Sequence, residues 1–525
     1  MWQKKSRVSL MNRFSKKEIL LVLLCLLVGF ILSFYTFDHR SLWVDEVYTF
    51  NDSRYGFKEQ IAFYKENPTF LHPPLFFILT HQFYPFNNPE RDLRIIPLIF
   101  GTLSIPMFYL LARQFSTSIA IPCMISLTFM TYHISLSQDG RSYALLMFFG
   151  MAGLYFFLRY LKTSETWPLI LTALFYALLF HTSYSAIPFI IFTQLLWFYR
   201  MDNGYKKPTL SSFLRLMSLT LIFCLPWIIF LGLNYKSQPI MNPYHTEGFG
   251  SFSSILRWIL NDWVPHLPLM IASVILLLLF PFFSNHKKNA IILLAILSLP
   301  IGSLFLFCQF LNITHFITSR YLINFLPLFL MSIYLSLHSI ETKSHHLKTF
   351  IRYTFIFILL FIGSNMTILP LYYQSQKQDI KGVVSYLKAH LKPGDKIFDG
   401  DRILTPGILH YFGAYPEGRQ YSVKVKQEAG NIIEYRKSFK YRNELFTIYW
   451  SNSCCTQYVA DGSRLWITVG KDSAKIFKED PAFVFKGYFD GSFLNWTRFP
   501  TDASIYLFLL DPSSPYERGI DWLIK

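Results

Sequence analysis

Long apolar segments with few charges recur along the first 370 residues of this 525-residue chain. A hydrocarbon core about 30 Å thick is crossed by about 20 mostly apolar helical residues. Only helices and closed barrels satisfy their backbone polar groups inside such a core. Each segment is long enough for one helix, and charged residues make up only 15% of the chain. The sequence therefore predicts a polytopic helical membrane protein.

Lysine and arginine residues set the predicted orientation of these helices. Basic residues precede the first apolar segment, residues 19–37, and recur after the second, fourth, sixth, eighth and tenth segments, which places the N-terminus in the cytoplasm. No small-residue cleavage site follows the first segment, so we expect an uncleaved anchor. Residues 38–92 then form a large outer loop. Within it, residues 71–85 contain three prolines and two histidines and are predicted to lie at the interface. About eleven spans result.

The composition of the sequence changes at residue 371. From there onward Gly, Asp, Lys and Tyr become frequent, and no membrane-length apolar segment remains. With an odd number of spans, residues 371–525 are predicted to form a soluble α/β domain on the outer face, and residues 1–370 the membrane domain. The segments that indicate α/β structure are a helical stripe at 380–391, a Lys392-Pro-Gly-Asp395 turn and extended stretches at 464–469 and 504–510.

The net charge of +17 has a better explanation than nucleic-acid binding. Much of it lies in the cytoplasmic basic clusters, whose usual roles are topology and contact with anionic lipids. Outer arginines such as Arg94, Arg141 and Arg320 are not needed for topology, and an anionic substrate would explain them. The sequence contains no P-loop, dinucleotide-binding or His-Glu-x-x-His motif, so nucleotide-dependent chemistry is unsupported.

Polar residues from segments far apart in the sequence are predicted to meet at the outer ends of the spans. Asp45 and Glu46 follow the first span and lie next to Trp43. Carboxylates beside a span end and an interfacial tryptophan favour a functional role over that of ordinary loop acids. The other residues at this depth are His72, Arg94, Asp139, Arg141, Tyr143, His181, Tyr184, Arg320 and Tyr321.

Several of these residues also have structural interpretations. Asp139 is as consistent with an ion pair to Arg141 at a span boundary as with a catalytic role. Arg94 is interpreted as a structural charge at the start of a span. Arg320 and Tyr321 resemble interface anchors as well as binding residues, because arginine side chains extend to the interface and tyrosine is common there.

The succession of motifs along the chain is more specific than any single motif. It runs Trp43-x-Asp45-Glu46, His72-Pro73-Pro74-Leu75, Arg94-x-x-Pro97, Gln138-Asp139-x-Arg141-x-Tyr143, Arg320-Tyr321 and Lys392-Pro-Gly-Asp395. This order resembles that of bacterial polyprenyl-phosphate-sugar-dependent glycosyltransferases of the GT-C class. That group is related to protein O-mannosyltransferases and to the aminoarabinose transferase of lipid A (families 39 and 83). The resemblance covers the membrane region and reaches into the outer domain.

The resemblance implies a membrane enzyme that takes a sugar from an isoprenoid phosphate carrier and passes it to the hydroxyl of a glycan, lipid or protein. It also implies a bacterial cytoplasmic membrane with a periplasmic C-terminal domain. Relatives more often carry Glu where this chain has Asp139, which is one methylene shorter. By resemblance, Asp45 is the catalytic base, Glu46 and Asp139 are further catalytic acids, and His72, Arg141, Tyr143, Arg320 and Tyr321 bind substrate.

The chemistry of such a transfer requires an acid and a cation. A hydroxyl is a weak nucleophile, so a carboxylate that accepts its proton contributes about 10²- to 10⁴-fold in rate. The departing phosphate needs a positive charge, which Arg320, with Arg141 or His72, could supply. A single displacement would invert the anomeric centre.

Metal dependence stays open at this point. Asp45, Glu46, Asp139 and His72 offer oxygen and imidazole ligands that suit a divalent ion. The relatives differ in whether they need one, so the sequence predicts no certain cofactor.

Two alternatives belong to other functional classes. A transporter or lipid flippase would carry charges through its spans and show Gly/Pro-broken helices in symmetric halves. The charges here lie at outer ends, and no half repeat is evident. A non-catalytic scaffold for envelope assembly would need only the topology and the outer domain, and it would tolerate substitution of Asp45.

Overall fold

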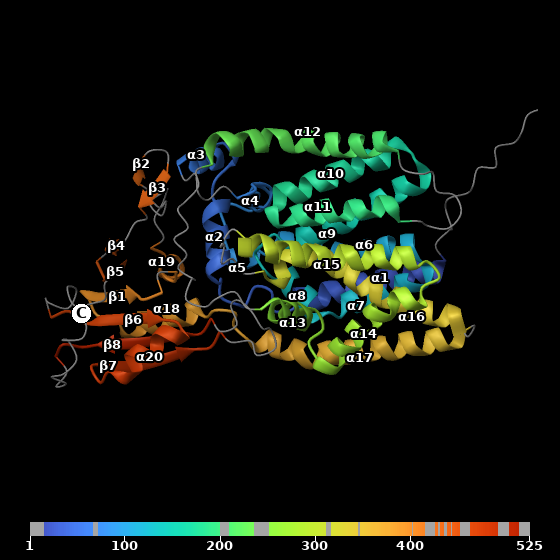
Figure 1. Ribbon diagram of the computed structural model, residues 1–525. Coiled ribbons are helices and arrows are strands. Elements are labelled where there is room, and N and C mark those ends of the chain that lie inside the picture. Colours follow the sequence, from blue (N-terminus) through green and yellow to red (C-terminus); the bar gives the residue numbers. More distant parts are fainter. Residues whose placement is uncertain are drawn as a thin grey trace, which may run out of the picture.

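A long helical body is joined at one end to a smaller mixed sheet in the computed structural model of the chain (Figure 1). The basic residues that precede Ser15, which contribute to the predicted orientation, lie outside the residues that the structure describes. The described residues are 15–66, 72–199, 209–235, 251–310, 317–344, 347–401, 403–414, 426–428, 431–434, 438–442, 444–451, 462–491 and 503–513.

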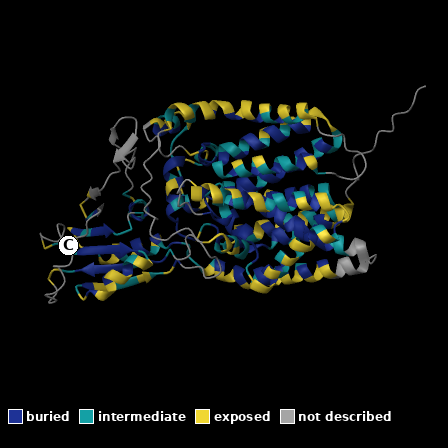
Figure 2. Cartoon of the chain, in the orientation of Figure 1, coloured by how far each residue is buried: buried dark blue, intermediate teal, exposed yellow. Residues whose placement is uncertain are grey.

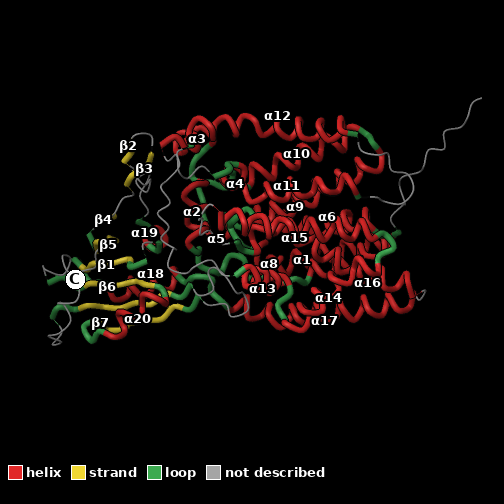
Figure 3. The backbone as a smooth tube through the Cα atoms, viewed as in Figure 1, coloured by secondary structure: helices red, strands yellow, loops and turns green. Residues whose placement is uncertain are grey.

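The helical body contains α1 to α17 and three short 3₁₀ segments (Figure 3). Their bounds are α1 Lys16–Phe34, α2 Val44–Ser53, α3 Phe57–Glu66, α4 Leu75–His81, α5 Pro89–Asp92, α6 Ile95–Phe115, α7 Thr117–Thr128, α8 Thr131–Ser137, α9 Tyr143–Thr163, α10 Thr166–Thr182, η1 Tyr184–Ala186, α11 Ile187–Phe192, η2 Thr193–Phe198, α12 Leu210–Asn234, α13 Phe252–Trp263, α14 Leu267–Phe283, α15 Lys287–Phe310, η3 Ser319–Phe325, α16 Leu326–Ser344 and α17 Leu347–Gln374.

Seven helices among the described residues are long and apolar enough to cross a membrane. Two further pairs, α7–α8 and α13–α14, are bent by 63° and 108°, and they raise the number to nine if each pair is one span. The predicted number of about eleven is reached only if the shorter apolar helices Thr166–Thr182 and Tyr184–Phe198 also cross. The prediction of a multi-pass helical membrane protein is confirmed.

Large apolar side chains cover the outside of the helical body. Leu20, Leu233 and Phe310 are 69%, 78% and 84% exposed, and Figure 2 shows a continuous exposed face along α12. A water-soluble protein rarely exposes so much contiguous apolar surface. These side chains therefore match a surface that faces lipid.

In its described residues, the loop 38–92 contains short helices only. Helices α2, α3, α4 and α5 lie at the end of the helical body that faces the sheet (Figure 1). The segment predicted to lie at the interface forms α4, whose seven residues cannot cross a membrane. This loop separates the bundle from the C-terminal sheet.

The C-terminal part is a six-stranded mixed sheet of order β4-β5-β1-β6-β8-β7. Strand β1 pairs in parallel with β5 and β6, and the other pairs in this sheet are antiparallel. A separate hairpin joins β2 and β3. The bounds are α18 Ile380–His390, β1 Asp395–Asp399, α19 Thr405–Phe412, β2 Lys426–Glu428, β3 Asn431–Glu434, β4 Ser438–Arg442, β5 Phe446–Ser451, β6 Leu465–Val469, α20 Lys471–Glu479, β7 Phe483–Phe489 and β8 Ile505–Leu510.

Helices cover both faces of this sheet. Ile397 of β1 packs into a core with α18 and α19, whereas the next residue, Phe398, packs into a second core with α20. Successive side chains of a strand point to opposite faces, which explains why Ile397 and Phe398 are both apolar and buried. The predicted α/β fold of the C-terminal part is confirmed. Since α17 continues to Gln374, the division of the chain between residues 370 and 371 stays a prediction.

Candidate active site

Helix α2 carries the adjacent acidic residues Asp45 and Glu46 in its first turn. Its N-cap residue is Trp43, so Asp45 and Glu46 are the second and third helical positions. Carboxylates are favourable there, because the N-terminal end of a helix carries partial positive charge. Consecutive helical residues point about 100° apart. The two carboxylates therefore enter different environments.

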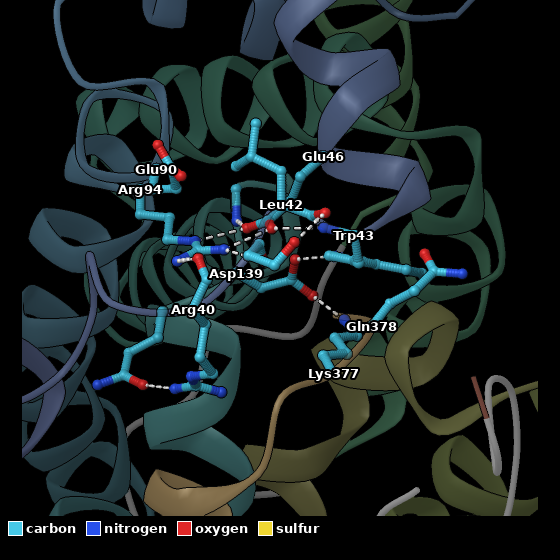
Figure 4. Close-up of polar contacts among 12 residues, drawn as sticks. Arg40, Leu42, Trp43, Glu46, Glu90, Arg94, Asp139, Lys377 and Gln378 are labelled. Atoms are coloured by element: carbon cyan, nitrogen blue, oxygen red, sulfur yellow. Dashed lines mark hydrogen bonds and ion pairs between the residues drawn. The ribbon is translucent and has the colours of Figure 1, made fainter. Parts of the chain in front are cut away.

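Glu46 is buried and fully engaged by its neighbours (Figure 4). Its two carboxylate oxygens accept hydrogen bonds from Arg94 Nε at 2.7 Å and Arg94 Nη2 at 2.6 Å. The backbone N–H of Gly140 donates to Oε1 at 2.6 Å, and that of Trp43 donates to Oε2 at 3.3 Å. A Cβ at position 140 would lie 3.0 Å from Oε1, so the glycine permits this close approach.

Arg94 uses its remaining donors on the backbone of the same loop. It donates to the carbonyl oxygens of Phe37, Arg40 and Ser41 at 2.7, 3.1 and 3.1 Å. With the two bonds to Glu46, all five guanidinium N–H groups have partners. The geometry therefore agrees with the structural interpretation of Arg94.

Asp45 has a different environment from Glu46. Its side chain is 26% exposed, compared with 1% for Glu46, and its Oδ2 lies 3.6 Å from Arg320 Nη1. Arg141 donates from Nη1 to the Asp45 carbonyl oxygen at 3.2 Å and to Thr49 Oγ1 at 3.1 Å. One arginine thus lies beside the Asp45 carboxylate, and a second holds its backbone.

Three aromatic rings surround the Arg320 guanidinium. Its carbon lies 5.5 Å from the Trp43 ring centroid, 5.9 Å from that of Tyr143 and 5.7 Å from that of Tyr321. Aromatic faces attract cations, and Trp does so most strongly. The structure therefore brings together four of the predicted residues, Asp45, Tyr143, Arg320 and Tyr321.

Asp139 is paired with a residue that the sequence analysis did not identify (Figure 4). Lys377 Nζ lies 2.9 Å from Asp139 Oδ2, and Trp43 Nε1 donates to Oδ1 at 3.0 Å. The Lys377 ammonium also lies 3.4 Å from the Trp43 ring centroid. Burial raises the pKa of Asp139, but the adjacent ammonium outweighs it and lowers that pKa below its ordinary value. Lys377 follows the last span, so the rule that identified Arg320 could also have found it.

A cavity of about 100 Å³ opens beside these groups. Arg320 and Lys377 contribute positive charge to its wall, next to Asp139. Another part of the wall carries Asp262, which accepts a hydrogen bond from Ser319, and Ser319 is bonded in turn to Tyr132 at 2.7 Å. Asp262, Ser319 and Tyr132 were not predicted as site residues, because serine and tyrosine are common near span ends and Asp262 lies in no recognised motif.

His72 is not among the residues that line this cavity. Its side chain is exposed, its ring packs against Phe77 at 6.4 Å, and it is close enough to Arg141 and Asp45 for electrostatic interaction. Among the residues that the structure describes, no three His, Cys, Asp or Glu side chains converge as metal ligands. The four residues considered for a metal do not form such a group, since Glu46 is bonded to Arg94 and Asp139 to Lys377.

Comparison with known proteins supports the resemblance seen in the sequence. Residues 71–230 match the family model described as dolichyl-phosphate-mannose-protein mannosyltransferase. That range contains His72, Arg94, Asp139, Arg141 and Tyr143. No curated protein matches the chain.

Two solved structures of one protein share the fold of the chain. The structure of ArnT from Cupriavidus metallidurans in the apo state aligns with a TM-score of 0.52 and 12% identity, and it covers 94% of this chain and 98% of that one. The structure of ArnT bound to undecaprenyl phosphate aligns with a TM-score of 0.50 and the same identity and coverage. The predicted resemblance is therefore confirmed: residues 71–230 match the mannosyltransferase family model, and the chain has the fold of ArnT.

Proposed function

We propose that this protein transfers a sugar from a polyprenyl-phosphate-linked donor to an acceptor hydroxyl, with Asp45 as the general base. The observation that carries the proposal is the contrast among the three predicted carboxylates. Glu46 accepts four hydrogen bonds from Arg94 and the backbone, and Asp139 is held by Lys377 and Trp43. Asp45 is partly exposed and lies beside a cation that a substrate phosphate can bind.

The donor phosphate is proposed to bind between Arg320 and Lys377. Both side chains line the same cavity, and Arg320 also lies 3.6 Å from Asp45. A phosphate there brings the breaking glycosidic bond close to the base. The ArnT structure that shares this fold was solved with undecaprenyl phosphate, which supports a carrier of this chemical class. Arg141 would keep Asp45 in place through its carbonyl oxygen.

The reaction is proposed as a single displacement. Asp45 takes the proton of the acceptor hydroxyl while the acceptor oxygen bonds to the anomeric carbon. The bond from that carbon to the phosphate oxygen breaks, and its electron pair stays with the phosphate, where Arg320 offsets the growing negative charge. Attack opposite to the leaving group inverts the anomeric centre. The acceptor is the hydroxyl of a glycan, lipid or protein, and the site faces the outer side of a bacterial cytoplasmic membrane.

Transfer from labelled donors tests this function. Membranes containing wild type, Asp45→Asn or Asp38→Asn are incubated with a panel of radiolabelled polyprenyl-phosphate sugars and the envelope material of the host. Asp38 is an acid of the same loop that pairs with His39 at the surface, so it is a matched control. We expect Asp45→Asn to lower the transfer rate by about 10²-fold or more and Asp38→Asn to match wild type.

Three other results would each contradict one part of the proposed function. Equal transfer by Asp45→Asn would reject Asp45 as the base. Absence of transfer by wild type with every donor would reject the glycosyltransferase function in favour of a transporter or scaffold. A product that keeps the anomeric configuration of the donor, as measured by NMR, would reject the single displacement.

A further inference from the structure

The segment that connects α17 to α18 crosses the loop that leads into α2. Within this segment, residues 375–379, two glutamine side chains accept hydrogen bonds from that loop. The N–H of Ser41 donates to Gln376 Oε1 at 3.1 Å, and the N–H of Val44 donates to Gln378 Oε1 at 2.9 Å. In return, the N–H of Lys381 donates to Ser41 Oγ at 3.2 Å.

Helix α19 of the C-terminal domain holds the same loop from another direction. The N–H of Leu42 donates to the Tyr411 hydroxyl at 2.7 Å, and that hydroxyl donates to Glu90 Oε1 at 3.2 Å. The Tyr411 ring packs on a small apolar cluster of Leu42, Val47 and Leu93. The neighbouring His410 ring lies 4.6 Å from that of Phe50.

These contacts replace a local helix cap. The first N–H groups of a helix have no partner within the helix, and the N-cap side chain usually accepts from one of them. The N-cap of α2 is Trp43, whose side chain has no acceptor oxygen. Gln378, 334 residues away in sequence, accepts from the first helical N–H, that of Val44. The next residue is Asp45.

We propose that the C-terminal domain is a positioning element of the active site, in which Gln378 and Tyr411 hold the start of α2 so that Asp45 points at Arg320. The three N–H groups at positions 41, 42 and 44 all donate to side chains that follow α17. Reacting groups must be held within a fraction of an ångström, and a displacement of about 1 Å costs on the order of 10²-fold in rate. The expected effect on the transfer rate rests on the proposed function, whereas the expected effect on the mobility of the loop does not.

Two measurements on the full chain test the proposal. Peptide-level hydrogen–deuterium exchange of residues 40–47 reports whether the loop is held, and it needs no substrate. Steady-state transfer in the assay described above separates kcat from KM. The variants are Gln378→Ala, Gln378→Glu, which keeps an acceptor oxygen, and Tyr411→Phe. Tyr386→Phe is the control. It removes the same hydroxyl group as Tyr411→Phe, but from a ring that packs on Trp466 in the C-terminal core.

We expect Gln378→Ala and Tyr411→Phe to speed exchange in residues 40–47 and to lower kcat by about 10- to 100-fold with an unchanged donor KM. Gln378→Glu should restore both properties in part, and Tyr386→Phe should behave as wild type. Unchanged exchange in residues 40–47 would overturn the proposal, whether or not transfer is detected. Faster exchange with an unchanged kcat would also overturn it, and so would an effect confined to the acceptor KM, which indicates acceptor binding by the domain.

Discussion

Arg94 and Glu46 form a buried, two-pronged ion pair in which Nη2 lies 2.6 Å from Oε2 and Nε lies 2.7 Å from Oε1. The pair joins the start of α6 to the start of α2, and Gly140 adds a third segment through its N–H group. Asp45 precedes Glu46 in sequence but lies outside this pair. Adjacent acidic residues therefore have separate structural environments, and their substitutions should have different effects.

Substitution of Glu46 should affect folding more than substitution of Asp45. Removing one partner of a buried ion pair leaves an uncompensated charge and costs about 3–5 kcal/mol, so Glu46→Ala should lower the midpoint of thermal unfolding strongly. Asp45→Ala breaks a longer, partly exposed pair, worth about 1 kcal/mol or less. Thermal unfolding of both variants in detergent checks the difference. Equal midpoints would contradict the structural role given to Glu46.

Substitution of Arg320 by lysine should weaken donor binding. Lysine keeps the charge but lacks the planar fork and stacks less well on aromatic rings. A hydrogen bond to a charged group contributes about 1.5–3 kcal/mol, so the donor KM of Arg320→Lys should rise by about 10- to 100-fold. The control is Arg91→Lys, an arginine of the same outer region whose side chain is 47% exposed. An unchanged donor KM would show that Arg320 does not bind the phosphate.

Asp139 and Lys377 should be coupled in a double-mutant cycle. Asp139→Asn leaves the Lys377 ammonium without its carboxylate, and Lys377→Met leaves the carboxylate without its ammonium. The double variant removes both charges, so its loss of stability should be smaller than the sum of the single losses by about 0.5–3 kcal/mol. Urea unfolding of the four proteins measures this coupling. Additive losses would mean that the pair contributes nothing beyond its separate residues.

Asp399 should make the C-terminal domain less stable as pH rises. The side chain is fully buried and accepts two hydrogen bonds from Thr405, both at 2.7 Å. Burial raises the pKa of Asp399 to about 7, although the bonds from Thr405 oppose the rise. The folded state therefore binds this proton more tightly than the unfolded state, whose carboxyl has a pKa of about 4. The stabilisation that this bound proton contributes to the folded state is complete below pH 4, and it is lost as the pH rises to about 7.

Asp399→Asn should remove that loss, because asparagine keeps an acceptor oxygen for Thr405 and carries no charge. Thermal unfolding at pH 5 and pH 8 should show a smaller difference for Asp399→Asn than for wild type. Asp472→Asn, at a side chain that is 85% exposed, should keep the wild-type difference. The same pH dependence in all three proteins would exclude Asp399 as its source.

Sequence reasoning predicted the elements whose signal is local. The helix expected at 380–391 and the strands at 464–469 and 504–510 are observed at Ile380–His390, Leu465–Val469 and Ile505–Leu510. Periodicity and turn residues reveal such elements because their cause lies within a few neighbouring residues. The number of spans was less certain, since α7–α8 and α13–α14 are bent and two apolar helices are short.

Some residues of the candidate site were predicted from the sequence, and others were not. Tyr143, Arg320 and Tyr321 were expected near Asp45, and the structure places them together. Lys377 was missed, although it pairs with Asp139 and lines the cavity. Its place just after the last span could have marked it as a candidate, but its pairing with Asp139, 238 residues earlier in the chain, could not be read from the sequence.

The sequence by itself determined the class of protein, and it grouped the polar residues that lie near the ends of the spans, because hydropathy and the distribution of charged residues are properties of the chain read in order. Only the tertiary structure decided which carboxylate has which partner. Asp45 and Glu46 are adjacent, yet Arg94 contacts Glu46 at 2.6 Å while Asp45 lies 3.6 Å from Arg320. A contact of 2.6 Å is a charge-assisted hydrogen bond, whereas 3.6 Å is too long for one. Those distances are set by packing between segments that are far apart in sequence.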